Sequence, residues 1–405
     1  MNEADEADWR AMAVRTLKGA SLEGLQHATV EGLAIYPLYA AAPALLYARR
    51  AFDEDRAWDV RVAVDHPDPI RANALTLEAL EGGATSTSLR ISDPADLEAR
   101  LRGVILDLAP VALDAGAHGP AAAEALGVLA KASPRAPLDF GLDPVGATSP
   151  IEASAVVAAR LAETYPLANL FRSSGRRVHE AGGGEALEIA VAAASGLAYA
   201  RALARAGLGI ERAFAGLTVE VTTDTDYFVS IAKLRAARAV FSRVAVACGA
   251  PATVRLAAVS SHRMLADKDA WSNMIRLTIA GFAAAAGGAD VVTLGCFSDP
   301  LGRPAALARR QSRNIQFILM EEAQMGRVRD PGAGSGYVEA LTDQLARAAW
   351  THFQAIESRG GAAAASAYVA AQVDAANMAR PTPRVVGMTD FVSADDTPIA
   401  VEADG

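Results

Sequence analysis

The sequence has little cysteine, no excess of basic residues and no long apolar run. Cys248 and Cys296 are its only cysteines, too few for a disulfide framework or a thiolate metal cluster, so both are expected to be small core residues. A net charge of −9 argues against nucleic-acid binding through bulk electrostatics. Residues 1–12 are acidic without the layout of a signal peptide, and no run of about 20 apolar residues indicates a membrane span. We therefore expect a cytoplasmic protein that binds neither nucleic acid nor membrane.

Two catalytic or metal-binding patterns are also missing. The chain has no Gly-x-Ser-x-Gly elbow, and nothing marks a Ser/His/Asp set. Its histidines include no His-x3-His or Glu-flanked pair that would place two ligands on one helix face. They stand at positions 27, 66, 118, 179, 262 and 352. The sequence gives a metal site little support, and we expect none.

A regular alternation of strand and helix patterns begins at Trp58. Short β-branched or apolar runs are each followed by a longer amphipathic stretch. The candidate strands are Trp58–Val64, Ser86–Ile91, Gly103–Leu108, Leu138–Phe140, Arg177–Glu180, Leu217–Thr222, Thr253–Ser260 and Asp290–Cys296. The candidate helices between them are Ile70–Leu80, Ala121–Lys131, Ile151–Thr164, Glu185–Ala206, Tyr227–Ala247 and Ala270–Ala286. Eight alternations favour a (β/α)8 TIM barrel, with an open doubly wound sheet as the alternative.

The segments outside this alternation predict an amino-terminal arm and extra carboxyl-terminal helices. Residues 1–57 would form a short helix and an arm, residues 58–300 the barrel core, and residues 301–405 the helices and tail that complete the domain. The extra helices are expected near Ala305–Met325, Val338–Arg359 and Ala362–Met378. We see no second globular domain.

Two acidic or glycine-rich loops admit either a structural or a functional interpretation. The loop Asp330–Gly336 has three glycines just before a helix, where backbone amides can bind phosphate. It lacks the Lys-Ser/Thr ending of a P-loop, so a structural turn is favoured. Asp224 and Asp226 precede the helix Tyr227–Ala247; helix capping is favoured over acid–base catalysis.

Basic and imidazole side chains are the remaining candidates. On the segment Ile231–Val244, a solvated helix face is favoured over contact with an acyl-CoA phosphate or a partner. Its basic residues are Lys233, Arg235, Arg238 and Arg243. His179 ends one candidate strand and His262 follows another. Barrel enzymes place their chemistry at such positions, although surface or capped histidines are the commoner outcome.

Several segments in order along the chain resemble the barrel domain of methylmalonyl-CoA mutases. They include TVEGLAIYPLY (Thr29–Tyr39), YFVSIAKLRAARAVFSRV (Tyr227–Val244), DAWSNMIRLTIAGFAAAAGGAD (Asp269–Asp290), ARRQSRNIQFILMEE (Ala308–Glu322), the run Arg327–Gly361 and VVGMTDF (Val385–Phe391). Within the family, the chain is most similar to the small, or beta, subunit of the heterodimeric enzyme. The resemblance implies interconversion of methylmalonyl-CoA and succinyl-CoA. It also implies that adenosylcobalamin supplies a radical while the acyl-CoA threads along the barrel axis.

The chain departs from the catalytic members of that family. It contains no Asp-x-His-x-x-Gly cobalt-ligand motif, so we expect no cobalamin-binding domain. In WDVRVAV the family's arginine remains as Arg61, but its catalytic tyrosine position falls on Ala63. The histidine of the family's His-x-Gln-Thr-Ser-Gly segment falls on Ala257, and His262 lies five positions later. The resemblance thus implies a non-catalytic chain, with adenosylcobalamin held by a catalytic large subunit in a heterodimer.

Two alternatives stay open. The chain could be an active mutase barrel that uses a cobalamin domain on a separate chain, or an acyl-CoA-binding module without radical chemistry. Arg61 and His179 are the candidate substrate-binding residues. The family helix implies that Asn314, Glu321 and Glu322 face a cofactor or a partner.

Overall fold

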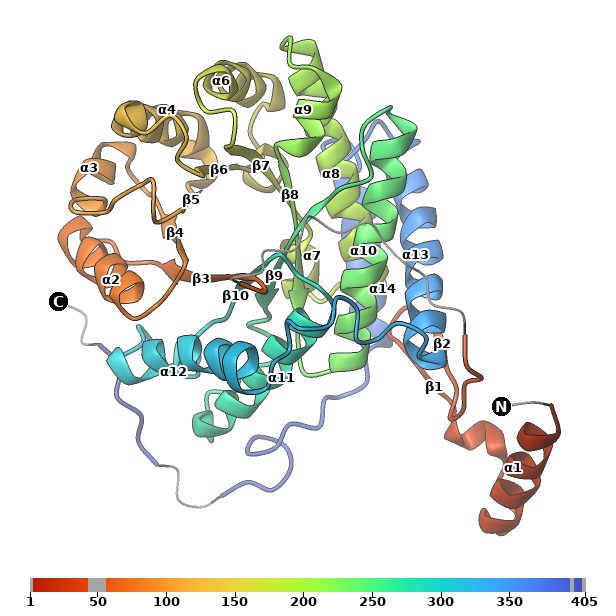
Figure 1. Ribbon diagram of the computed structural model, residues 1–405. Coiled ribbons are helices and arrows are strands. Elements are labelled where there is room, and N and C mark those ends of the chain that lie inside the picture. Colours follow the sequence, from red (N-terminus) through yellow and green to blue (C-terminus); the bar gives the residue numbers. More distant parts are fainter. Residues whose placement is uncertain (1–2, 43–55, 394–396, 403–405) are drawn as a thin grey trace.

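The computed structural model describes residues 3–42, 56–393 and 397–402. Eight parallel strands close into a barrel in the order β10-β3-β4-β5-β6-β7-β8-β9 (Figure 1). Their bounds are β3 Asp59–Val64, β4 Ser86–Arg90, β5 Val111–Asp114, β6 Asp139–Leu142, β7 Asn169–Ser174, β8 Leu217–Thr223, β9 Arg255–Ser260 and β10 Val291–Thr293. The pairing of β10 with β3 and with β9 closes the ring. The predicted (β/α)8 barrel is confirmed, and the open sheet is excluded.

Helices surround this barrel. Their bounds are α2 Pro69–Glu81, α3 Leu97–Arg100, α4 Gly119–Leu129, α5 Pro144–Ala147, α6 Ile151–Thr164, α7 Arg176–Glu180, α8 Glu185–Arg205, α9 Ile210–Ala215, α10 Tyr227–Ala247, α11 Asn273–Ala286 and α12 Ala306–Phe317. A π-helical turn, η7 Ile318–Glu322, extends α12, and α13 Gly336–Glu357 and α14 Ser366–Ala379 follow. The short 3-10 turns are η1 Leu22–Leu25, η2 Pro94–Asp96, η3 Gly116–His118, η4 Ala130–Ala132, η5 Ala270–Ser272 and η6 Asp299–Leu301.

Two of the eight predicted strands are wrong. Residues 103–108 form turns in which Ile105 and Leu108 are 61% and 77% exposed, and the strand β5 comes three residues later. The segment Arg177–Glu180 lies in helix α7, and the strand of that unit is β7. The interior side of β7 carries Arg172 and Ser174, which contact Asp114 on β5 and Glu220 on the adjacent strand β8. Because these interior positions are polar, the sequence of β7 lacks the apolar pattern that predicts a strand.

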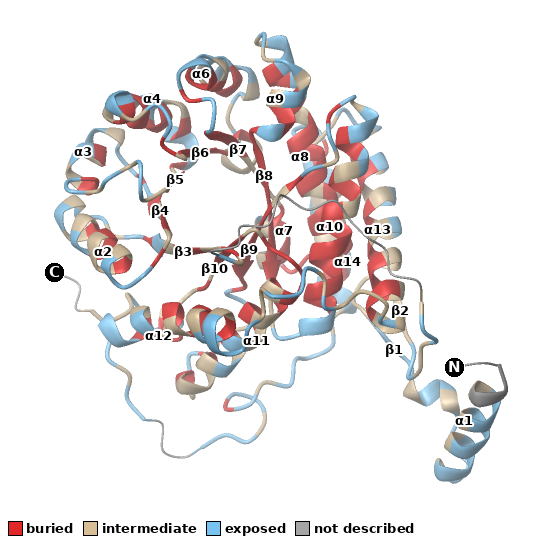
Figure 2. Cartoon of the chain, in the orientation of Figure 1, coloured by how far each residue is buried: buried red, intermediate tan, exposed pale blue. Residues whose placement is uncertain are grey.

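The thickest part of the core lies outside β7, β8 and β9. There α8 packs on α10 and α13, and all three helices are largely buried on their facing sides (Figure 2). Among the described helices, α8 is the one long and apolar enough to cross a membrane by composition, but 83% of that window is buried inside the fold. Its alanines permit the close helix packing, so its apolar residues belong to the protein core.

The amino-terminal arm leaves the barrel beside α13. It contains α1 Glu3–Thr16 and a two-stranded hairpin of β1 His27–Ala28 and β2 Ala34–Ile35. Helix α1 projects away from the barrel (Figure 1). The hairpin region is anchored by Glu31, whose carboxylate accepts hydrogen bonds from the amides of Ala186 and Leu187 at the start of α8. The division at residues 57 and 300 stays a prediction.

Candidate functional site at the carboxyl end of the barrel

Ion pairs fill the axis of this barrel where many such barrels have layers of apolar side chains. Arg61 on β3 donates to Asp139 Oδ2 at 3.0 Å and to Asp59 Oδ2 at 3.3 Å. It also donates to Ser86 Oγ at 2.9 Å. Burial favours the neutral form of Asp59, but Arg61 and the hydroxyl of Thr85 outweigh it and hold the pKa of Asp59 below its usual value. Arg61 is thus fully engaged inside the barrel.

A second cluster of charged side chains adjoins the first and comes from β5, β7 and β8. Arg172 on β7 donates to Asp114 Oδ1 at 2.9 Å and lies 3.9 Å from Glu220. The hydroxyl of Ser174 donates to Glu220 at 2.7 Å. Although burial opposes the charged form, Glu220 and Asp114 raise the pKa of Arg172 above its usual value. Mutual pairing offsets the cost of holding these charges inside the barrel.

A cavity of about 410 Å³ opens above the first cluster. It lies at the carboxyl ends of β3, β4, β9 and β10 and extends between α2 and α12. Its lining includes the small side chains of Ala63, Ser88 and Thr293, and Ala63 is exposed to it. Charged groups surround this space, namely Asp65, Arg90, Asp114, Arg176, Asp299, Arg303, Arg309, Arg313 and Glu402, together with His66 and His262. Its position and polar rim are typical of the ligand sites of this fold.

The predicted substrate-binding residues do not line this cavity. Arg61 is absent from its lining, and His179 is fully buried on α7, not at the end of a strand as predicted. His262, by contrast, is exposed at the cavity. Ala257 lies in β9 and is 5% exposed. Assignment of Arg61 and His179 to substrate binding stays a prediction.

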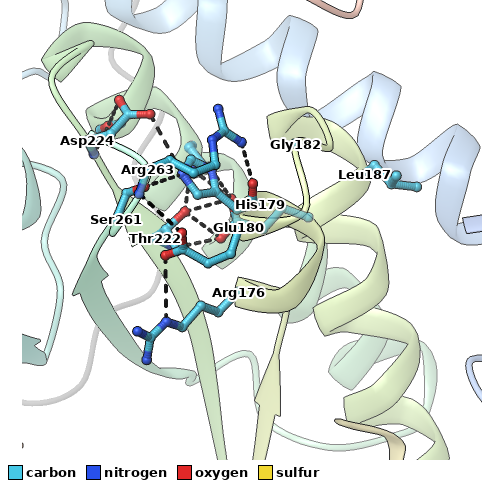
Figure 3. A network of polar contacts seen from close by, with 12 residues as sticks. Arg176, His179, Glu180, Gly182, Leu187, Thr222, Asp224, Ser261 and Arg263 are labelled. Atoms are coloured by element: carbon cyan, nitrogen blue, oxygen red, sulfur yellow. Dashed lines mark hydrogen bonds and ion pairs between the residues drawn. The ribbon is translucent and has the colours of Figure 1, made fainter. Parts of the chain in front are cut away.

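His179 belongs to a buried polar network beside the cavity (Figure 3). Its Nε2 lies 2.8 Å from Ser261 Oγ, directly after β9, and 3.9 Å from Asp224 Oδ2, directly after β8. Its Nδ1 lies 3.6 Å from Glu188 Oε2 on α8. Burial, followed by the positive charges of Lys233 and Arg263, holds the pKa of His179 well below its usual value. The imidazole is therefore neutral at physiological pH.

A buried ion pair supports His179 from behind. Lys233 Nζ donates to Glu188 Oε2 at 2.7 Å and to Thr222 Oγ1 at 3.1 Å. The other oxygen of Glu188 accepts from the amide of Thr222 at 2.6 Å. Burial opposes the charge on Lys233, but Glu188 and Glu185 raise its pKa above the usual value. The ammonium of Lys233 is therefore held in its charged form beside Glu188.

The prediction of a solvated basic face on residues 231–244 is wrong for three of its four residues. Lys233, Arg235 and Arg238 are at most 2% exposed, because α10 is covered by α8, α11 and α13. Arg235 pairs with Asp330 and Glu339, and Arg238 pairs with Asp290. Arg243 is exposed and lies over the Trp350 ring.

Both favoured loop interpretations are confirmed. Asp226 is the N-cap of α10, and its Oδ1 accepts from the amide of Val229 at 3.3 Å. Asp224 Oδ1 accepts from the amide of Asp226 at 3.0 Å. The loop 330–336 starts α13, with Ser335 as N-cap, and its Gly334 amide already donates to Glu339.

The residues predicted to face a cofactor or partner lie far along α12. Asn314 is half-buried, and Glu321 and Glu322 are exposed on the π-helical turn. Gln316, between them, accepts from the indole of Trp58, just before β3 begins. This places them toward the amino end of the barrel, opposite the cavity. Their role stays a prediction.

The two cysteines are half-buried and free. Cys296 lies at the cavity, and burial raises the pKa of its thiol well above the usual value. The thiol is therefore neutral, which does not favour nucleophilic chemistry.

Sequence reasoning missed Glu185, Glu188 and Ser261. Glu185 and Glu188 sit in the first turn of α8, where acidic residues are common. Ser261 follows a strand with no surrounding pattern. Only their position after a barrel strand or at a helix start could have indicated them.

Comparisons with known proteins point to one family. The family model described as methylmalonyl-CoA mutase matches residues 149–401. The methylmalonyl-CoA mutase small subunit of Streptomyces virginiae is 38% identical, with 95% of this chain and 68% of that protein covered. The small subunit of Propionibacterium freudenreichii subsp. shermanii is 35% identical, with 87% and 60% covered. The methylmalonyl-CoA mutase of Escherichia coli is 28% identical, with 88% and 59% covered. The chain thus spans less than two thirds of the latter two relatives.

Proposed function

Because the chain belongs to the methylmalonyl-CoA mutase family, we propose that it is a non-catalytic, small-subunit-type barrel that pairs with a catalytic mutase subunit. The single observation that carries this proposal is the methyl group of Ala63 in the wall of the open cavity. The family resemblance puts the catalytic tyrosine at this position. A methyl group cannot donate a hydrogen bond to a substrate carbonyl. The small-subunit names of two relatives support a heterodimer with a large subunit.

The described residues do not fit adenosylcobalamin by themselves. This cofactor supplies a carbon radical in the family, and its cobalt takes an imidazole ligand. The imidazoles of His66 and His262 line the cavity and His179 is fully buried, so the misfit lies in what could hold the corrin and not in the lack of an imidazole. In residues 3–42, 56–393 and 397–402, the strands outside the barrel form only a two-stranded hairpin. We therefore assign the cofactor to the partner subunit.

The test is a reconstitution. The purified chain is mixed with adenosylcobalamin and methylmalonyl-CoA, alone and together with a catalytic large subunit, and succinyl-CoA is measured. We expect no turnover from the chain alone and co-elution with the large subunit on size-exclusion chromatography. Turnover by the chain alone would refute the proposal. Turnover only with a free cobalamin domain would favour the alternative of an active barrel with a separate cofactor chain.

The cavity favours a second candidate function, an acyl-CoA-binding module. Its volume of about 410 Å³ is within the range of small-ligand sites, and arginines surround it. Calorimetry with methylmalonyl-CoA and with CoA tests this function. Binding to the isolated chain that is weakened by a bulky residue at Ala63 would support it, and the absence of heat would remove it.

A further inference from the structure

Three potential metal ligands converge next to the cavity from separate segments. They are His179 on α7, Glu185 at the first position of α8 and Asp224 directly after β8. One ligand atom from each lies within 4.8 Å of the other two. We propose that these three side chains bind one divalent metal ion. Because the ligands come from different elements, no spacing motif announces the site in the sequence.

The distances fit a single ion with small adjustments. Ligand atoms that bind one metal at about 2.1 Å each lie at most about 4.2 Å apart. His179 Nε2 and Asp224 Oδ2 are 3.9 Å apart and already meet this limit. The ligand atoms of the other two pairs are up to 4.8 Å apart. A side-chain movement of well under about 1 Å would bring each pair within this limit. Glu185 and Asp224 are half-buried, so a metal ion can reach the site from solvent.

The imidazole is prepared for this role by the groups around it. Ser261 Oγ accepts from the amide of Arg263 at 3.2 Å, which leaves its O–H to donate to His179 Nε2 at 2.8 Å. A metal ion at Nε2 would replace this hydroxyl as the partner of the single lone pair, while the proton stays on Nδ1. That nitrogen is buried without a hydrogen-bond partner among the described residues and faces Glu188 Oε2 at 3.6 Å. A carboxylate behind the second nitrogen is the usual support of a metal-binding histidine.

The two carboxylates share one nearby cation, Lys233, whose ammonium is bound to Glu188. Burial raises the pKa of Glu185, and the charge of Lys233 and a hydrogen bond from its own backbone amide only partly oppose this rise. Asp224 uses Oδ1 for the amide of Asp226, which leaves Oδ2 facing His179.

The cations that surround the cluster are directed elsewhere. Lys233 is paired with Glu188. The guanidinium of Arg263 donates to the carbonyl of His179, and that of Arg380 donates to the carbonyl of Gly182. A bound cation would therefore add positive charge beside Glu185 and Asp224, which share Lys233 with Glu188.

The donor set selects the class of ion. One imidazole nitrogen and two carboxylate oxygens suit first-row divalent ions such as Zn²⁺, Co²⁺ or Mn²⁺ more than Mg²⁺ or Ca²⁺. Three protein ligands leave coordination positions for water or a ligand. The site does not depend on the proposed partner, so it is expected in the isolated chain.

The test is metal binding to the full-length chain after removal of metal with a chelator. Zn²⁺ is titrated by calorimetry, and Co²⁺ is followed by its visible absorption. The variants are Asp224→Asn and Glu185→Gln, which keep the side-chain size. The control is Glu152→Gln, a surface carboxylate whose side chain is 71% exposed. The thermal midpoint of each variant without metal shows whether it is folded.

We expect one ion per wild-type chain and a Co²⁺ spectrum that disappears in Asp224→Asn. Affinity should fall at least about tenfold in both site variants, by comparison with the loss seen for outer residues of metal sites, and should be unchanged in Glu152→Gln. Failure of the wild-type chain to bind either ion at millimolar concentration would overturn the proposal. Equal binding in folded site variants would do the same, because the ion would then lie elsewhere.

Discussion

The carboxyl end of this barrel has two halves of opposite character. Around β3, β4 and β10, small side chains such as Ala63 and Ser88 leave a cavity bordered by charged groups. Around β7, β8 and β9, His179, Glu188 and Lys233 fill the same level with a closed polar network. Both halves contain many charged side chains, but those of the open half border the cavity, whereas those of the closed half are buried against one another. The difference indicates that the pair of Glu188 and Lys233 stabilises the fold in the closed half, and that the open half has the space for an organic ligand.

The largest expected effect comes from breaking the closed half at Lys233. The change Lys233→Met leaves Glu188 buried without its cation, so the free energy of unfolding should fall by about 3–5 kcal/mol. The double variant Lys233→Met/Glu188→Gln removes the unpaired charge and keeps an acceptor for the Thr222 amide. It should recover much of this loss in denaturant unfolding. A double variant no more stable than Lys233→Met would contradict the role of the pair.

A smaller effect, dependent on pH, is expected at Glu31 behind the closed half. Burial, assisted by the nearby charge of Glu185, raises the pKa of Glu31 from 4.5 to about 7. A raised folded-state pKa means that the neutral form is favoured in the fold. Stability from this group is therefore fully present below about pH 4.5 and is lost as the pH rises to about 7.

The variant Glu31→Gln should remove this pH dependence. Unfolding free energies are compared at pH 5 and pH 8 with chelator present. The free energy of unfolding of the variant, taken relative to that of wild type, should rise by on the order of 3 kcal/mol from pH 5 to pH 8. This follows from about 1.4 kcal/mol per unit of pKa difference between the folded and unfolded states. An identical pH profile for the two proteins would show that Glu31 titrates normally.

The smallest effects come from adding carbon atoms to each half. At Gly175 a Cβ would lie 2.3 Å from the carbonyl oxygen of Glu188, so Gly175→Ala should cost about 1–3 kcal/mol. On the open side, Ala63→Val adds two carbons facing the cavity and should change stability by less than about 0.5 kcal/mol. Thermal unfolding of both variants measures the contrast. Equal costs would mean that the two halves are packed alike.

Much of the fold could be predicted from local periodicity. The bounds of α6 and α10 agree with the prediction, since both helices carry long amphipathic or apolar stretches. The sequence does not predict β7, because its interior positions are polar. Those side chains are buried with charged partners such as Asp114, which lies 58 residues away from Arg172 in the chain.

The site was less predictable because its contacts join distant segments. The sequence pattern predicts a surface position for Lys233 because its partner Glu188 lies 45 residues earlier in the chain. In the same way, Arg235 pairs with Glu339, which lies 104 residues later. A single sequence carries no signal for such pairs. The family resemblance did identify Ala63 as a departure, and the structure places that residue in the cavity wall.

The most direct test of the account is the amount of corrin that the isolated chain retains. The purified chain is incubated with adenosylcobalamin and passed through a desalting column in the dark, and the visible absorption of the protein fraction is recorded. A non-catalytic barrel that depends on its partner for the cofactor should elute without corrin. One equivalent of corrin per chain would contradict the account.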